Sequence, residues 1–180
     1  MVWLNFPVLR SKCNTGKAWV FRNPLDLMPP LQRVPPSPNS TGPWIDTEVR
    51  VRYAETDQMG VAYYANYLVW FEVGRGEFCR QRGFVYRDFE RENEAHLAVA
   101  EAQCRYHRSA RYDDVLIIRT RIQEFHRKTV RFEYEIVKKD DVTRIASAWT
   151  LHIILDKKGK MKPFPPEYAH FLKPEATQEM

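Results

Sequence analysis

The distribution of proline constrains this chain more than any other feature of its sequence. Eight of the twelve prolines lie within the first 44 of the 180 residues, six of them between Pro29 and Pro43. Proline lacks a backbone N–H and its ring clashes with a preceding helical turn, so neither a helix nor a central strand can continue through such a stretch. We therefore expect residues 1–44 to form a disordered, proline-rich extension, residues 45–172 to form one folded domain, and residues 173–180 to form a C-terminal tail.

The positive charge of the chain lies mostly in the same extension. The formal net charge is +5, and residues 1–44 contain five basic residues and one acid, which leaves only +1 for the remainder. Nucleic-acid-binding domains carry a basic face on the folded unit, so nucleic acid is not expected as a partner. A targeting segment, and an extension upstream of a chain that starts at Met28, are the alternative interpretations of residues 1–44.

The cysteine content and the hydropathy pattern indicate a cytoplasmic protein. The three cysteines, Cys13, Cys79 and Cys104, have no metal-binding spacing, and their odd number favours free thiols in a reducing compartment. The sequence contains no run of about 18 apolar residues that could span a membrane. The five histidines form no H-x-x-x-H or H-E-x-x-H pair, so no metal site is expected.

The hydrophobic pattern of the folded part predicts five strands and one long helix. Apolar and charged residues alternate from Glu48 to Tyr53, which is typical of a half-buried strand. Apolar residues then recur at three- and four-residue steps from Asn66 to Arg82, which predicts a helix that ends before Gly83. Four further strands are predicted over Leu97–Tyr106, Asp114–Phe125, Thr129–Lys138 and Arg144–Leu155. This order predicts an α+β fold in which a largely antiparallel sheet covers one helix.

An acidic residue stands in the loop between the first strand and the long helix. Asp57 belongs to a turn at residues 56–60, and residues 61–65 lead into the helix. A helix N-terminus presents unpaired N–H donors and a partial positive charge, which suits an oxygen that gains negative charge. An aspartate beside such donors could attack a carbonyl carbon or activate water. The alternative is an ordinary turn whose aspartate only caps or is solvated, and spacing alone favours it.

The residues around and after Asp57 also form an ordered motif that runs through strand, loop and helix. Its members are Glu55, Thr56, Asp57, Gly60, Val61, Tyr63, Asn66, Tyr67, Phe71, Glu72, Arg75 and Glu77. Together with residues 105–114 and 150–152, this motif resembles the hotdog-fold thioesterases of the 4-hydroxybenzoyl-CoA thioesterase class, which include acyl-CoA thioesterases linked to the Tol-Pal system. The resemblance extends over residues 46–160.

The resemblance implies a hotdog fold, in which an antiparallel five-stranded sheet wraps around one long helix, and hydrolysis of an acyl-CoA thioester to a free acid and coenzyme A. It places Asp57 at the catalytic carboxylate, as nucleophile or as general base toward water. It places Tyr64 where a backbone N–H polarises the thioester carbonyl. Many relatives have histidine there, but any non-proline residue supplies the N–H. Tyr63, Asn66 and Gly60 are implied to line the site or orient the substrate.

The same resemblance implies partners and leaves alternatives open. Hotdog protomers of this class pair side by side, with active sites at the protomer interface, which implies a homodimer or a dimer-built homotetramer. No cofactor or metal is expected, because sulfur already activates the carbonyl and the protein supplies the carboxylate and the helix dipole. One alternative is a non-catalytic acyl-CoA-binding module. The other is a hotdog hydratase or dehydratase, which would need a histidine beside the carboxylate.

Several other side chains have two interpretations each. Cys79 lacks a histidine partner by spacing and is expected to be a small buried hydrophobic residue. His152, on a predicted strand, is expected to be packed and hydrogen-bonded rather than catalytic. Lys157–Lys160, Arg108 and Arg111 are either solvated or contact the phosphates of coenzyme A.

Overall fold

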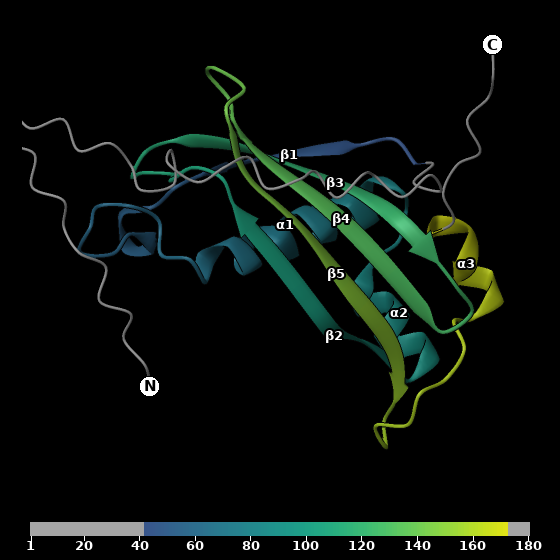
Figure 1. Cartoon of the computed structure of the whole chain (residues 1–180). Helices are drawn as coiled ribbons and strands as arrows, with labels where there is room; N and C mark the ends of the chain where they lie inside the picture. The colour runs from purple at the N-terminus through teal and green to yellow at the C-terminus, as the bar shows by residue number, and fades with distance from the viewer. Residues whose placement is uncertain (1–41, 173–180) are drawn as a thin grey trace, which may run out of the picture. The chain divides into compact units, whose positions relative to one another are not determined.

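A five-stranded antiparallel sheet packs against one long helix in the computed structural model, which describes residues 42–172 (Figure 1). The strands are β1 Ile45–Arg50, β2 Ala95–Tyr106, β3 Val115–Phe125, β4 Thr129–Lys138 and β5 Arg144–Asp156, in the order β1-β3-β4-β5-β2 across the sheet. The long helix is α1, Asn66–Gln81. These elements confirm the predicted α+β fold. The predicted extension, apart from residues 42–44, and the predicted tail lie outside the described residues.

The core lies between α1 and the inner face of the sheet. Side chains alternate between the two faces of a strand, and every second residue of β3 and β4 is buried along most of each strand. Phe71 of α1 stacks on Tyr134 with ring centroids 4.8 Å apart, and Phe78 meets Phe132 edge-on at 5.9 Å. Full burial of such a side chain stabilises the fold by about 1.5–3 kcal/mol. These aromatic contacts therefore hold α1 against the middle of the sheet.

Gly74 allows α1 to approach β3 closely. A Cβ atom at this position would lie 2.7 Å from Cγ2 of Ile118 and 2.7 Å from Oγ1 of Thr120. Glycine in a helix interior costs about 1 kcal/mol relative to alanine. The close contact between helix and sheet explains why a glycine is accommodated at this point of α1.

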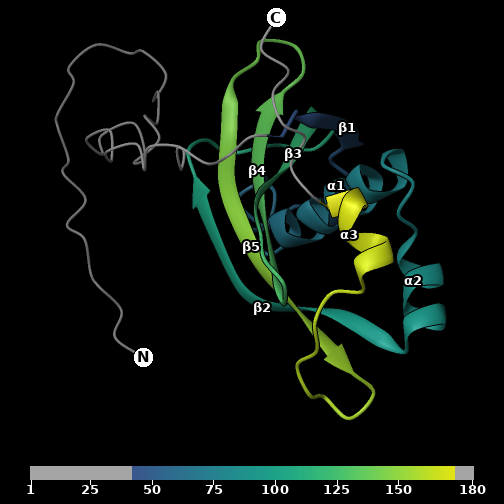
Figure 2. The same cartoon turned by 90° about the vertical axis from the view of Figure 1, so that its right-hand side faces the viewer.

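Three short helical segments supplement the predicted elements. They are the 3-10 turn η2 Tyr53–Glu55, α2 Tyr86–Asn93 and α3 Pro166–Leu172. Figure 2 shows α2 and α3 on the same side of the sheet as α1. Phe89 of α2 stacks on Phe164, which precedes α3, with centroids 5.4 Å apart. No helix within residues 42–172 is long and apolar enough to cross a membrane.

The first strand ends earlier than the alternating pattern predicts. The pattern continues to Tyr53, whereas β1 ends at Arg50. Val51 is still buried in step with the alternation, and the chain turns after it because Glu55 stabilises the 3-10 turn that follows. The carboxylate of Glu55 accepts a hydrogen bond from the backbone N–H of Arg52 at 2.8 Å.

Candidate active site

The loop that carries Asp57 is held in place by backbone hydrogen bonds. The N–H of Asp57 donates to the carbonyl of Val61, and the N–H of Gly60 donates to the carbonyl of Asp57, both at 2.9 Å. Gly60 has φ +70°, a conformation that glycine adopts without steric cost. The N–H of Ala62 donates to the carbonyl of Ala110 at 2.8 Å. The Asp57 turn is therefore closed on itself and attached to the loop between β2 and β3.

The carboxylate of Asp57 has one oxygen available for chemistry. Its Oδ1 atom accepts the backbone N–H of Met59 at 2.8 Å, which fixes the orientation of the side chain. Its Oδ2 atom has no hydrogen-bond partner among the residues that the structure describes. A free carboxylate oxygen can accept a proton from water or attack a carbonyl carbon directly.

Tyr64 lies just before the N-terminus of α1, which begins at Asn66 with Ala65 as its N-cap. The carbonyl of Tyr63 accepts the N–H of Asn66 at 3.0 Å, which orients the peptide group between residues 63 and 64. The N–H of Tyr64 has no acceptor within the described part of the chain. This N–H, together with the positive end of the helix dipole, can stabilise an oxygen that becomes negatively charged.

Tyr106 of β2 fixes the start of α1, a role that the sequence did not predict for it. Its hydroxyl donates to the carbonyl of Tyr64 at 3.1 Å, and its ring meets that of Tyr67 edge-on at 4.9 Å. Burial, with smaller effects from neighbouring groups, raises the pKa of Tyr106 to about 12, so the hydroxyl remains a donor at neutral pH. The only signal in the sequence is that Tyr106 lies in the stretch 105–114 that resembles the family's loop.

Glu55 connects the Asp57 loop to α1, and it was not among the predicted site residues. Its buried carboxylate accepts hydrogen bonds from the backbone N–H and Nη2 of Arg52, both at 2.8 Å, and from Nε1 of Trp70 at 3.3 Å. Its carbonyl accepts the N–H of Tyr63 and Nδ2 of Asn66, both at 2.8 Å. Burial acts to raise the pKa of Glu55, but the hydrogen bonds from Arg52 and Trp70 outweigh it and lower the pKa. The ionised carboxylate thus anchors the loop to the helix.

A pocket of about 700 Å³ brings three of the predicted site residues together. Its lining consists of Tyr53, Ala54, Thr56, Asp57, Gln58, Tyr63 and Asn66. Gly60 and Tyr64 do not line it. Gly60 lies in the turn that presents Asp57, and the exposed ring of Tyr64 contacts that of Tyr63 in a tilted arrangement with centroids 4.4 Å apart. The predicted residues therefore form one region around the pocket. Within it, the side-chain amide of Asn66 donates a hydrogen bond to the carbonyl of Glu55.

The side chains of His152 and Cys79 lie in the interior of the protein, as expected from the sequence. His152 is completely buried, and its Nε2 lies 2.8 Å from Oγ1 of Thr150. Burial, aided by the charge of Arg75, lowers the pKa of His152 to about 3. Cys79 is also completely buried, and burial raises the pKa of its thiol to about 12. Within residues 42–172 no three His, Cys, Asp or Glu side chains are grouped in a way that could hold a metal ion.

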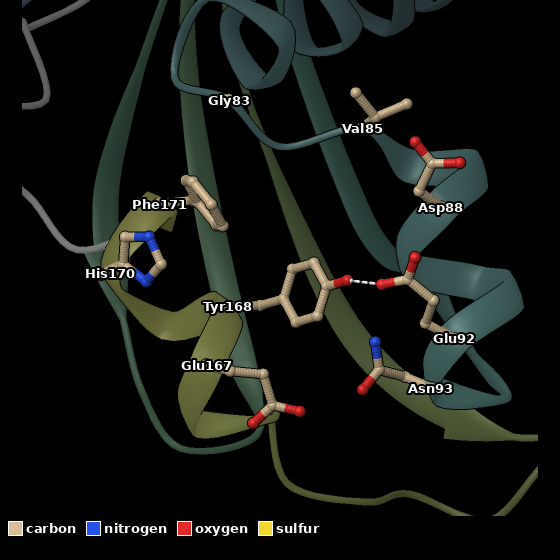
Figure 3. Close-up of a pocket in the computed structure, with 9 residues that line it drawn as sticks. All are labelled: Gly83, Val85, Asp88, Glu92, Asn93, Glu167, Tyr168, His170 and Phe171. Carbon is tan, nitrogen blue, oxygen red and sulfur yellow. Dashed lines mark hydrogen bonds between the residues drawn. The ribbon is translucent and has the colours of Figure 1, made fainter.

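A second pocket of about 440 Å³ lies between α2 and α3 and contains none of the predicted site residues (Figure 3). The carboxylates of Asp88, Glu92 and Glu167 line it, and the hydroxyl of Tyr168 donates to Glu92. These negative charges would repel the phosphates of coenzyme A. The pocket around Asp57 is therefore the candidate active site.

Comparison with known proteins gives consistent matches to this part of the chain. The sequence profile of the thioesterase-like superfamily matches residues 51–172. Acyl-CoA thioesterase YbgC of Haemophilus influenzae is 34% identical over 121 residues, which are 66% of this chain and 87% of that protein. The crystal structure of DHNA-CoA thioesterase from Staphylococcus aureus matches with a TM-score of 0.68 and 28% identity, over 71% of this chain and 87% of the other. The 1,4-dihydroxy-2-naphthoyl-CoA thioesterase from Synechocystis has the same fold, with a TM-score of 0.67 and 19% identity over 72% and 96% of the two chains.

These matches cover the elements that build the site. The profile begins at Val51, directly after β1, and continues through the Asp57 loop, α1 and the remaining strands. The predicted family resemblance and the predicted hotdog fold are both confirmed. The chain belongs to the thioesterase-like superfamily.

Proposed function

We propose that this chain hydrolyses an acyl-CoA thioester to a free acid and coenzyme A. The observation that carries the proposal is the Asp57 carboxylate, whose Oδ2 atom has no partner in the described residues and which lines a pocket of about 700 Å³ at the start of α1. Pockets of this size bind small molecules and cofactors. The name of the Haemophilus influenzae relative, an acyl-CoA thioesterase, supports thioesters as the substrate class.

The free carboxylate oxygen can act in two ways. As a general base, Oδ2 of Asp57 takes a proton from water while the water oxygen attacks the thioester carbon. The C–S bond then breaks, and coenzyme A leaves as a thiolate that takes up a proton. As a nucleophile, Oδ2 attacks the carbon itself, and the C–S bond breaks so that coenzyme A leaves as a thiolate that takes up a proton. Water then hydrolyses the resulting acyl-aspartate anhydride, which releases the free acid and restores the Asp57 carboxylate. In both routes the N–H of Tyr64 stabilises the oxyanion of the tetrahedral intermediate.

The variant Asp57→Asn tests the carboxylate. Asparagine retains an oxygen that can accept the N–H of Met59, so the turn and the fold should persist. Turnover should fall by a factor on the order of a hundred or more, because an amide is neither a good base nor a good nucleophile. Release of free thiol from a panel of acyl-CoA esters measures this effect. Turnover near the wild-type value in a folded Asp57→Asn protein would contradict the assignment.

Substitutions at Tyr64 extend the same assay to the backbone donor. Tyr64→Phe and Tyr64→His retain the N–H and should stay active, whereas Tyr64→Pro removes it and should lose activity. Because this N–H has no acceptor in the described part of the chain, proline breaks no native hydrogen bond there. If the wild-type protein binds acyl-CoA but releases no thiol, the chain is a binding module instead. The pocket lining contains no histidine that would favour a hydratase.

We also infer that the chain forms a homodimer, or a tetramer built from such dimers, through β2 and the neighbouring side of α1. β2 is an edge strand, and an edge strand with exposed apolar residues readily pairs with another chain. Val99 of β2 is 54% exposed, and Leu68, Val69 and Val73 of α1 are exposed as well. β2 contacts the start of α1 through the rings of Tyr106 and Tyr67, and exposed apolar side chains on both elements favour an interface between protomers.

A further inference from the structure

Two exposed tyrosines lie at the mouth of the Asp57 pocket. Tyr53 lines the pocket and is 78% exposed, and Tyr112 in the loop between β2 and β3 is 58% exposed. Their rings meet edge-on, with centroids 5.7 Å apart and planes at 89°. Exposed aromatic rings in contact with each other and with a pocket offer flat apolar faces to a ligand.

Arg111 lies against the Asp57 turn, in the same loop as Tyr112. Its Nη1 atom is 4.0 Å from the place that a Cβ atom on Gly60 would occupy. Arg111 precedes Tyr112 in the chain, so the guanidinium and the exposed ring belong to the same loop. The loop is attached to the Asp57 segment through the hydrogen bond from Ala62 to Ala110.

The guanidinium of Arg111 has no carboxylate partner in the described part of the chain, although acids follow it closely. Asp113 forms an ion pair with Arg50 at 2.9 Å. Asp114 forms an ion pair with Lys138 at 2.6 Å. Its carboxylate also accepts a hydrogen bond from the backbone N–H of Arg111, not from the guanidinium. The positive charge of Arg111 is therefore left for an external anion.

We propose that Arg111, Tyr53 and Tyr112 form a subsite for the phosphate-bearing part of the thioester's carrier, a proposal that rests on the hydrolase function above. A thioester held at Asp57 must extend its thiol arm outward through the pocket mouth. In coenzyme A this arm leads to phosphates and an adenine ring. A guanidinium binds phosphate oxygens through charge-assisted hydrogen bonds, and aromatic rings stack on bases.

The other basic segment that could contact phosphates, residues 157–160, lies elsewhere in the fold. Residues 157–160 form the turn after β5, and Figure 1 shows this turn and the loop between β2 and β3 at opposite ends of that strand. The 13 residues of β5 separate the two ends by about 40 Å. Lys157 is also paired with Glu94 at 2.7 Å. Arg111 lies against the Asp57 turn with its guanidinium unpaired in the described residues, whereas Arg52 is paired with Glu55 at 2.8 Å and Arg50 with Asp113 at 2.9 Å.

The experiment compares carriers that share one acyl group. Thiol release is measured for the coenzyme A ester, the 4′-phosphopantetheine ester and the N-acetylcysteamine ester, which carries no phosphate. The variants are Arg111→Gln, Arg111→Lys and, as a matched loss of one charge at the far end of β5, Lys158→Gln. Arg111→Gln should raise KM for the coenzyme A ester about tenfold and leave kcat within about twofold, as loss of a charge-assisted hydrogen bond predicts. Arg111→Lys should have a smaller effect, and Lys158→Gln none.

The three carriers identify what the guanidinium contacts. An effect that persists with the phosphopantetheine ester places Arg111 at the phosphate next to the pantetheine arm, and an effect confined to the coenzyme A ester places it at the nucleotide. Either result supports the subsite. An equal rise of KM for the N-acetylcysteamine ester, or an equal effect of Lys158→Gln, would overturn it.

If no ester is hydrolysed, the proposed hydrolase function is refuted, but the phosphate subsite can still be tested by direct binding. Calorimetric titration of free coenzyme A into the full-length protein should give a Kd about tenfold weaker for Arg111→Gln than for the wild type. Equal Kd values for the two proteins would refute the subsite whatever the activity of the chain.

Discussion

A methyl group added at Gly74 tests whether α1 lies as close to β3 as the structure shows. The substitution is Gly74→Ala, and Gly76→Ala in the same helix is the matched control. Helix propensity alone predicts that replacing glycine by alanine raises the free energy of unfolding by about 0.8–1.0 kcal/mol in both variants. The surroundings of the two positions predict opposite outcomes.

The difference follows from the atoms that each new Cβ would meet. At position 76 it would meet only Nη2 of Arg80 at 3.7 Å, an ordinary contact with a flexible side chain, so Gly76→Ala should stabilise the protein by about 0.5–1 kcal/mol. At position 74 it would lie 2.7 Å from atoms of both Ile118 and Thr120. Both residues are completely buried and β-branched, so neither side chain can rotate away freely. Overpacking of this kind costs about 1–3 kcal/mol, which after the gain in helix propensity leaves Gly74→Ala less stable than wild type by up to about 2 kcal/mol.

Urea unfolding at one fixed protein concentration measures both free energies, since association would make stability depend on concentration. The midpoint should fall for Gly74→Ala and rise for Gly76→Ala, with unchanged m-values. In thermal unfolding each kcal/mol should shift Tm by about 2–4 °C. If Gly74→Ala proves as stable as Gly76→Ala, the helix does not pack on β3 at the described distance, and the reasoning about Gly74 is wrong.

Two further predictions concern the buried carboxylate of Glu55 and the proposed dimer interface. The pKa of Glu55 is lower in the folded state than in the unfolded chain, so its stabilising effect is complete above about pH 4.3 and is lost as the pH falls through the folded-state pKa. Glu55→Gln should therefore cost about 1–3 kcal/mol in urea unfolding at pH 7 and clearly less at pH 3, and an equal deficit at both pH values would contradict this. Val73→Glu should convert the dimer to monomers in sedimentation equilibrium, whereas Val142→Glu, in the turn between β4 and β5, should not. A wild-type monomer, or a Val73→Glu dimer, would refute the proposed interface.

The strands and the long helix could be predicted because their buried residues follow fixed periods. β4 spans Thr129–Lys138 as the alternation predicts, and α1 begins at the predicted residue and ends at Gln81, one residue earlier than predicted. α2 was missed because its eight residues contain one buried residue, Phe89, and are too few to show a helical period. Such a short helix is stable only through its packing in the fold.

The site could be predicted only as far as a motif extends along the chain. The motif places Asp57, Tyr63 and Asn66, and the structure gathers all three around one pocket. The roles of Glu55 and Tyr106 depend on contacts between distant residues, which leave no local pattern. Glu55 is bonded to a tryptophan 15 positions away, and Tyr106 is bonded to a carbonyl 42 positions away.

These distant contacts matter more for reactivity than for stability. The proposed carboxylate of Asp57 and the proposed N–H donor of Tyr64 belong to one loop. The carbonyl of Glu55, at the start of this loop, accepts hydrogen bonds from the N–H of Tyr63 and from Nδ2 of Asn66, which lie on either side of Tyr64. Each such hydrogen bond adds only about 1 kcal/mol to the free energy of unfolding. A displacement of about 1 Å between reacting groups, however, can slow an enzyme about a hundredfold. Changes that loosen this connection should therefore lower turnover well before they unfold the protein.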